Sequence, residues 1–192
     1  MNFISSNSGS LAYTPSRTFS NSVAIGGFAL LTAVGAQIAI PTVPVPFTMQ
    51  TVFVLLSGAI LGARRGATAQ LVYLAMGATG LPVFAGFSGT FVHLFGPTGG
   101  YLMAFPLAAY VTGYLFRDTE LLRALPRFAA AALSMTLAML LLFAMGLSYL
   151  NLVYIHDWSA AFTAGFVNLQ VWDAVKIFSA AGIAASVRRR SV

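Results

Sequence analysis

The chain has 192 residues, of which 58% are hydrophobic and only 7% are charged. A soluble globular domain carries about 25% charged residues, so this composition excludes an ordinary soluble domain and favours the lipid bilayer as the natural solvent. The net charge of +6 is scattered over short loops and forms no basic stripe with interleaved aromatic residues, so we expect anionic lipid headgroups and no nucleic acid as partners.

The N-terminal segment, residues 1–22, is polar and rich in serine and asparagine. It lacks the basic and apolar regions of a signal peptide, so we expect a disordered cytoplasmic tail. Residues 23–192 are expected to form a single domain with six apolar segments, each predicted as a membrane-spanning helix and bounded by prolines, glycines or arginines. The segments cover residues 23–40, 48–63, 67–81, 101–116, 127–150 and 170–187.

The positions of the basic residues predict how these helices cross the membrane. The gaps 41–48, 82–100 and 151–168 contain no lysine or arginine. Nine of the ten basic residues lie in the alternate gaps or at the ends: Arg17, Arg64, Arg65, Arg117, Arg123, Arg127, Arg188, Arg189 and Arg190. This alternation predicts an all-α membrane protein with six transmembrane helices and with both termini in the cytoplasm. The long aromatic gaps 82–100 and 151–168 are expected to cover the outer face.

The last apolar segment contains an aspartate and a lysine, Asp173 and Lys176, which are three residues apart and therefore project from one helix face. A charge at mid-depth costs about 2.5–3.5 kcal/mol on insertion scales, so both side chains should face the bundle interior or an outward-open cavity. They can form a structural ion pair that holds helices together, or a polar ligand site. Their position near the aromatic outer loops favours a site for a small, mostly apolar ligand with a few polar groups.

Nothing in the sequence indicates catalysis. There is no HExxH motif, no Gly-x-Ser-x-Gly motif, no glycine-rich phosphate loop and no second intramembrane aspartate for an acid–base dyad. The absence of cysteine excludes thiolate chemistry and cysteine-ligated metals. His93 and His156 are single loop histidines, which we interpret as loop-packing or interfacial residues. We therefore predict a protein that is not an enzyme and has no cofactor or metal.

Four motifs in order resemble one family: VPFTMQT at 45–51, GLPVFAG at 80–86, GPTGGYL at 96–102 and Asp-x-x-Lys in the last helix. Together they resemble BioY, the biotin-binding S components of energy-coupling factor (ECF) transporters, over about residues 23–187. The resemblance implies a six-helix fold in a prokaryotic cytoplasmic (inner) membrane, with a high-affinity biotin pocket near the outer face. It also implies a transmembrane T component and two ABC-type ATPases as partners.

The resemblance directs attention to particular residues for biotin binding. The Asp173 carboxylate can accept hydrogen bonds from the ureido N–H groups, and the Lys176 ammonium can donate to the ureido carbonyl or to the ligand carboxylate. Ser88 stands where some relatives carry an asparagine that binds biotin, and it can contact the ligand directly or through a water.

Further residues have two interpretations each. Tyr101 can lie along the pocket or belong to an interfacial aromatic belt. Gly86 can let the backbone approach the ligand or only supply a turn. Gln50 can line the pocket or cap a helix, and the proline-rich segment 41–47 can form a lid or a rigid joint.

Ala29 and Ala33 form an Ala-x-x-x-Ala face in the first predicted helix. Small residues at this spacing let helices approach closely, either inside the bundle or at a partner interface. In the family that the sequence resembles, such a face contacts the T component, so we predict a partner interface here.

Taken together, these features predict a substrate-specificity component that captures biotin for uptake across the membrane. The alternative is a stand-alone facilitator or transporter of another small vitamin-like solute, which would bind its ligand weakly. A purely structural subunit, in which the ion pair only joins helices, is a further possibility.

Overall fold

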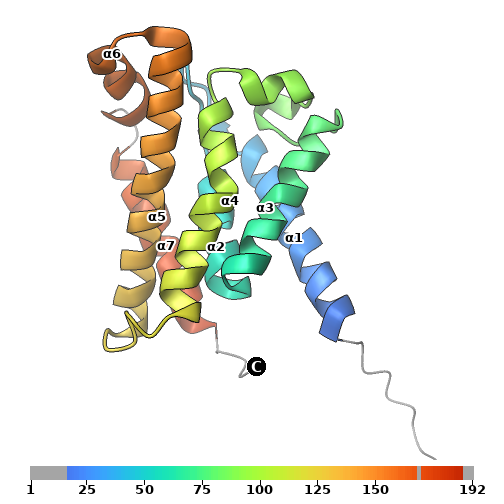
Figure 1. The fold of residues 1–192 in the computed structure, drawn as a ribbon, viewed down its shortest axis with the longest axis vertical. Helices are drawn as coiled ribbons and strands as arrows, with labels where there is room; N and C mark the ends of the chain where they lie inside the picture. The colour runs from blue at the N-terminus through green and yellow to red at the C-terminus, as the bar shows by residue number, and fades with distance from the viewer. Residues whose placement is uncertain (1–16, 168–169, 188–192) are drawn as a thin grey trace, which may run out of the picture.

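The protein is a bundle of helices, seen here in a computed structural model that describes residues 17–167 and 170–187 (Figure 1). The long helices are α1 (Arg17–Gln37), α2 (Gln50–Leu61), α3 (Ala63–Ala78), α4 (Gly99–Gly113), α5 (Arg127–Leu150) and α7 (Gln170–Ser186). A short helix α6 (Trp158–Phe162) lies between α5 and α7. Single 3-10 or π turns cover Ala85–Phe87, Phe91–Phe95, Tyr114–Asp118, Asn151–Ile155 and Thr163–Val167.

Each of the six predicted helices has a counterpart, but their ends differ from the predicted ones. The bounds of α5 agree with the prediction, whereas α1 begins at Arg17, six residues before the expected start. The residues between Arg17 and Val23 include no proline or glycine, so nothing in the backbone stops the helix from extending through them. The end of the segment expected to form a tail, residues 17–22, is therefore helical, and residues 1–16 lie outside the described part.

Close helix packing fixes the centre of the bundle. Helix α4 packs against α2, α3 and α5, while α1 contacts α2 and α3, and α7 contacts α2 and α5. Gly58 of α2 lies directly against the Ala109 carbonyl of α4, and a Cβ atom at Gly66 of α3 would lie 2.7 Å from the Gly58 Cα atom. Three helices thus meet backbone to backbone, as small residues allow in membrane bundles.

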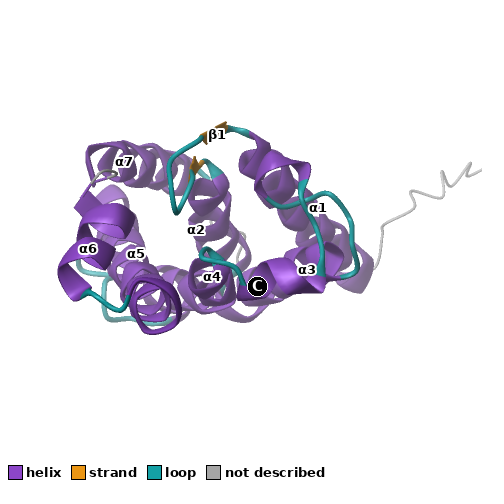
Figure 2. Ribbon diagram, turned by 90° about the horizontal axis from the view of Figure 1, so that it is seen from above, coloured by secondary structure: helices purple, strands orange, loops and turns teal. Residues whose placement is uncertain are grey.

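Three connecting segments gather at one end of the bundle, at the top of Figure 1. The first carries a two-residue antiparallel pair, β1 (Ala39–Ile40) and β2 (Phe47–Thr48), which ties the segment 38–49 back on itself (Figure 2). The other two are 79–98 and 151–167. We call this end of the molecule the loop end.

The outward-facing helix surfaces are apolar. Among the described residues, the continuous helical stretch Arg127–Ile155 is long and apolar enough to cross a membrane, and Gln50–Leu61 is apolar but shorter. Large hydrophobic side chains are also exposed on the other long helices, among them Leu30, Leu71, Leu107 and Phe178. Exposed apolar surface on this scale fits a protein surrounded by lipid.

Candidate functional site

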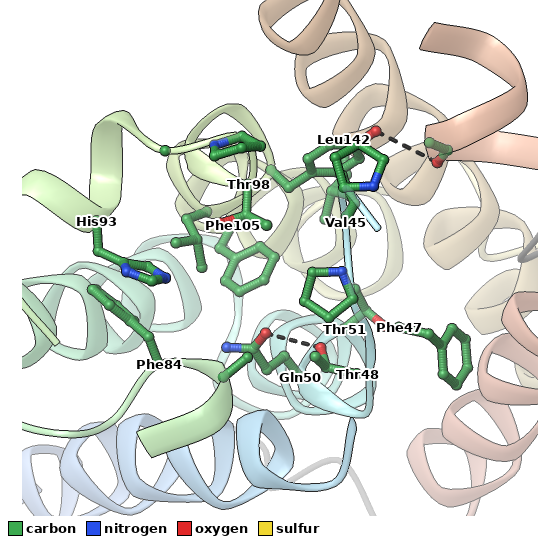
Figure 3. A pocket seen from close by; sticks show the side chains of 18 of the residues that line it. Val45, Phe47, Thr48, Gln50, Thr51, Phe84, His93, Thr98, Phe105 and Leu142 are labelled. Atoms are coloured by element: carbon green, nitrogen blue, oxygen red, sulfur yellow. Dashed lines mark hydrogen bonds between the residues drawn. The ribbon is translucent and has the colours of Figure 1, made fainter. Parts of the chain in front are cut away.

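A cavity of about 560 Å³ lies at the loop end of the bundle (Figure 3). Its walls come from the 44–48 segment, from residues 84–98, from the loop-end turns of α2, α4 and α7, and from the part of α5 that faces them. Most of the lining is apolar or aromatic, with a few polar side chains, which is the usual composition of a small-molecule site.

The predicted pair, Asp173 and Lys176, lies in the wall of this cavity on the first two turns of α7. Both residues are buried, with exposed fractions of 7% and 4%. Lys176 Nζ donates to Asp173 Oδ1 at 2.9 Å and to Thr51 Oγ1 at 3.2 Å. The same nitrogen lies 3.5 Å from the centroid of the Phe47 ring, a cation–π geometry. The ammonium is therefore compensated from three sides.

The Asp173 carboxylate is less completely engaged than its partner. Oδ1 accepts from Lys176, and within the described part of the chain Oδ2 has no hydrogen-bond partner. A buried ion pair gains from every additional hydrogen bond that satisfies its remaining lone pairs. The site thus offers an unused charged acceptor next to a cationic donor.

Gln50, at the start of α2, lines the cavity, but its amide is already bonded on both sides. Its Oε1 atom accepts from Thr48 Oγ1 at 2.8 Å, and its Nε2 group donates to the Tyr73 hydroxyl. Tyr73 in turn donates to the Val83 carbonyl at 3.3 Å. This chain of hydrogen bonds ties the cavity wall at Thr48 and Gln50 to α3 and to the segment before Phe84. The alternative role of Gln50 as a helix cap is wrong, because Met49 occupies the cap position and the Gln50 amide bonds to Thr48 and Tyr73.

Tyr101, near the start of α4, also lines the cavity and is buried. Its ring meets Phe143 edge to face, with centroids 6.3 Å apart, and its hydroxyl donates to the Gly165 carbonyl at 3.4 Å. This burial is incompatible with the alternative of an interfacial belt tyrosine, whose ring would face the membrane surface.

Ser88 and Gly86 do not lie where we predicted. Neither lines the cavity, and Gly86 is exposed in a turn with φ of 70° and has open space beside it. That turn needs glycine for its backbone angle and not for close approach to a ligand. The Ser88 hydroxyl is 3.3 Å from the His93 Nε2 atom, and it is His93 that reaches the cavity. His93 thus lines the cavity as well as packing against its own loop, and a single sequence does not show this because the direction of the 3-10 turn Phe91–Phe95 depends on the fold.

Other lining residues were missed although they lie within the quoted motifs. Phe47 and Thr51 flank Gln50 in the VPFTMQT run, and both contact Lys176. The proline-rich segment contributes Pro44, Val45 and Pro46 to one wall, which is the position expected of a lid.

Ala29 and Ala33 are not on a partner surface. Their exposed fractions are 0% and 9%, and both belong to the hydrophobic core of the bundle. The prediction of an exposed interface is corrected: this face of α1 packs inside the molecule, against α2 and α3. The large apolar residues that α1 exposes lie beside this face and include Leu30, Leu31 and Val34.

A helical bundle that encloses a largely apolar cavity with a buried ion pair in its wall defines a small-molecule-binding protein. The same fold occurs in a solved structure described as the S-component for biotin from an ECF-type ABC transporter. The two superpose with a TM-score of 0.82 over 94% of this chain and 96% of that chain, at 19% sequence identity, which shows a shared fold.

Comparison of sequences identifies relatives that are more similar to this chain than that solved structure is. Residues 10–191 match the model of the BioY family, and the chain belongs to that family. The biotin transporter BioY of Thermotoga maritima is 42% identical over 167 residues, which are 87% of this chain and 95% of that protein. A probable biotin transporter BioY of Lysinibacillus sphaericus is 41% identical over 157 residues, which are 79% of this chain and 78% of that protein.

Proposed function

We propose that this protein captures biotin and is the substrate-specificity component of an ECF-type transporter. The observation that carries the proposal is the buried Asp173–Lys176 pair in the wall of an aromatic cavity. Membership in the BioY family and the names of the relatives support it. A transport component of this kind binds its ligand and does not convert it.

The chemistry of biotin matches the polar groups of the cavity. One edge of its ureido ring presents an N–H donor beside the carbonyl acceptor, and the Asp173 carboxylate and the Lys176 ammonium can pair with these two atoms. The thiophane ring and the valerate chain are apolar and suit walls that contain Phe105, Leu142 and Phe143. Charge-assisted hydrogen bonds inside such a desolvated pocket are short and strong.

The same proposal includes the membrane topology and the partners. The chain crosses a prokaryotic cytoplasmic membrane six times, with both ends inside, and the loop end faces outward. This orientation follows from the arginines at the other end of the bundle, such as Arg64, Arg117 and Arg123. A transmembrane T component and two ABC-type ATPases then supply the energy for release on the inside.

Isothermal titration of the full chain, purified in detergent, tests the binding step. We expect tight binding of one biotin per chain, and much weaker binding of an analogue that lacks the ureido N–H groups. Weak, unsaturable binding of biotin would instead support a stand-alone facilitator for another solute, and equal binding of the analogue would remove the ureido contacts from the proposal.

A further inference from the structure

A second polar position lies in the cavity wall, away from the ion pair. Figure 3 shows His93 and Phe84 on one side of the cavity and Phe47 on the other. Because Lys176 Nζ lies over the Phe47 ring, the ion pair belongs to the Phe47 side. The imidazole of His93 thus stands across the cavity from the charged pair.

The His93 ring is held in a fixed orientation. It stacks on the buried ring of Phe84, with centroids 5.6 Å apart and planes inclined by 24°. Its Nε2 atom is 3.3 Å from Ser88 Oγ. Contacts on the face and on one ring nitrogen leave the imidazole little freedom to rotate, so the direction of its other nitrogen is set by the protein.

The hydrogen bonds of Ser88 also determine the tautomer of His93. The Ser88 hydroxyl lies 2.8 Å from the Ala85 carbonyl oxygen, which can only accept, so the single hydroxyl hydrogen is used there. Ser88 Oγ must then accept from His93, which places the ring proton on Nε2. Nδ1 is left with a lone pair and has no hydrogen-bond partner among the residues described.

We propose that His93 Nδ1 is a ligand-binding acceptor that receives an N–H group of the ligand, and that Ser88 is a positioning residue that sets the His93 tautomer. This inference rests on the proposed function in taking biotin as the ligand. At neutral pH the carboxylic acid of biotin is ionised, so its two ureido N–H groups are its only donors. These two groups diverge from the ring, and a pocket that satisfies both needs acceptors on two walls. Asp173 supplies one acceptor and His93 supplies the other.

The test compares two substitutions of nearly equal shape, His93→Asn and His93→Leu. An asparagine can place its side-chain oxygen at the position of Nδ1, whereas leucine fills the same space without an acceptor. By isothermal titration with biotin, we expect His93→Leu to weaken binding by about tenfold or more and His93→Asn to retain most of the affinity. Thermal unfolding of each purified variant establishes that it is folded.

Two lactam analogues of biotin, each with one ureido N–H replaced by CH₂, identify the contact. The loss caused by His93→Leu should disappear with one analogue, and the loss caused by Asp173→Asn should disappear with the other. If His93→Leu binds biotin like the wild type, or if His93→Asn loses as much as His93→Leu, the acceptor role is wrong. If the wild-type protein does not bind biotin, the proposed function itself fails, which is a different result.

The role of Ser88 has its own readout. In the wild-type protein, ¹⁵N chemical shifts of His93 should show a protonated Nε2 and an unprotonated Nδ1. Ser88→Ala removes the acceptor that fixes this tautomer, so the spectrum should shift towards a mixture and biotin binding should weaken less than in His93→Leu. An unchanged tautomer in Ser88→Ala would contradict the positioning role.

Discussion

At the scale of single residues, the two members of the buried ion pair have different surroundings. Lys176 is held by Asp173, Thr51 and the Phe47 ring, all of which are supplied by the protein. Asp173 uses Oδ1 for Lys176, and its Oδ2 has no hydrogen-bond partner among the residues that the structure describes. In the proposed site, the carboxylate is therefore the member of the pair that meets a donor of the ligand.

Replacing Asp173 by asparagine should consequently weaken biotin binding by about 1–3 kcal/mol, because a charged acceptor becomes a neutral group and Lys176 loses its counter-ion. Isothermal titration measures the change. Glu120→Gln is the matched control, since it makes the same chemical change at an exposed side chain that pairs with Arg123. That surface pair contributes little, so the control should bind biotin normally. Wild-type affinity in Asp173→Asn would exclude Asp173 from the site.

The residues of the site were predictable to the extent that their chemistry is local. Asp173 and Lys176 could be found because charges within an apolar helix are costly and must face inward. Gln50 and Tyr101 were placed correctly in the wall because they flank turns rich in proline or glycine. Ser88 was misplaced, since the path of the loop from Phe84 to Phe95 depends on stacking and on hydrogen bonds across the fold. The same loop path brings His93 to the cavity.

At the scale of whole elements, the burial of one face of α1 decides how its Ala-x-x-x-Ala motif is interpreted. Its small residues face α2 and α3, and its larger apolar residues face outward. A sequence shows the spacing of Ala29 and Ala33 but does not show which side of the helix is covered. Only the observed packing separates internal contact from partner contact.

Substituting Ala29 by leucine should therefore destabilise the fold by about 1–3 kcal/mol, because the extra methylene groups have no space in a packed core. Val34→Leu enlarges an exposed residue of the same helix and should leave stability unchanged. Thermal unfolding in detergent, followed by circular dichroism, compares the two variants with the wild type. If Ala29→Leu is stable and binds biotin but does not support uptake with its partners, the original prediction of a partner interface on this face of α1 would be supported.

The contact between α2 and α4 provides a second prediction for an element. A Cβ atom at Gly58 would collide with the Ala109 carbonyl, whereas one at Gly182 of α7 would meet no atom within 4 Å. Gly58→Ala should lower the thermal unfolding temperature because two helix backbones must separate. Gly182→Ala is the matched control and should be neutral or slightly stabilising, since alanine favours the helix more than glycine does. Equal unfolding temperatures for the two variants would contradict the close approach.

The helices themselves were easier to predict than the segments between them. Each long helix was predictable from a long apolar run, and the start of α5 was predictable because Pro126 directly precedes Arg127. Helix α6 was missed although Asp157 Oδ1 accepts from the backbone N–H groups of Ser159 and Ala160, which is an ordinary N-cap. The 79–98 segment could not be derived, because contacts such as that of Tyr149 with the Phe95 carbonyl join distant parts of the chain.

At the scale of the whole molecule, the two ends of the bundle differ in composition. The end that holds the α2–α3 joint and the loop after Asp118 carries Arg64, Arg65 and Arg123, whereas the loop end is aromatic and contains the cavity. In the proposed topology, this asymmetry orients the arginines towards the cytoplasm and the cavity towards the outside. A ligand from outside then meets the proline-rich segment and the 79–98 segment before it meets the ion pair.

The absence of cysteine from the sequence allows a direct test of this orientation. Cysteine is introduced at Val43 and at Ser159 in the loop-end segments, and at Leu121 at the other end of the bundle. Val43 and Leu121 are well accessible, with exposed fractions of 93% and 73%. A membrane-impermeant maleimide applied to intact cells should label the first two variants, and should label Leu121→Cys only after permeabilisation. The unsubstituted protein serves as the unlabelled control. Residues 121 and 159 lie on either side of the helical stretch Arg127–Ile155. Labelling of both from the same side of the membrane would therefore contradict a single crossing by that stretch. Labelling of Leu121→Cys alone in intact cells would place the cavity on the cytoplasmic face.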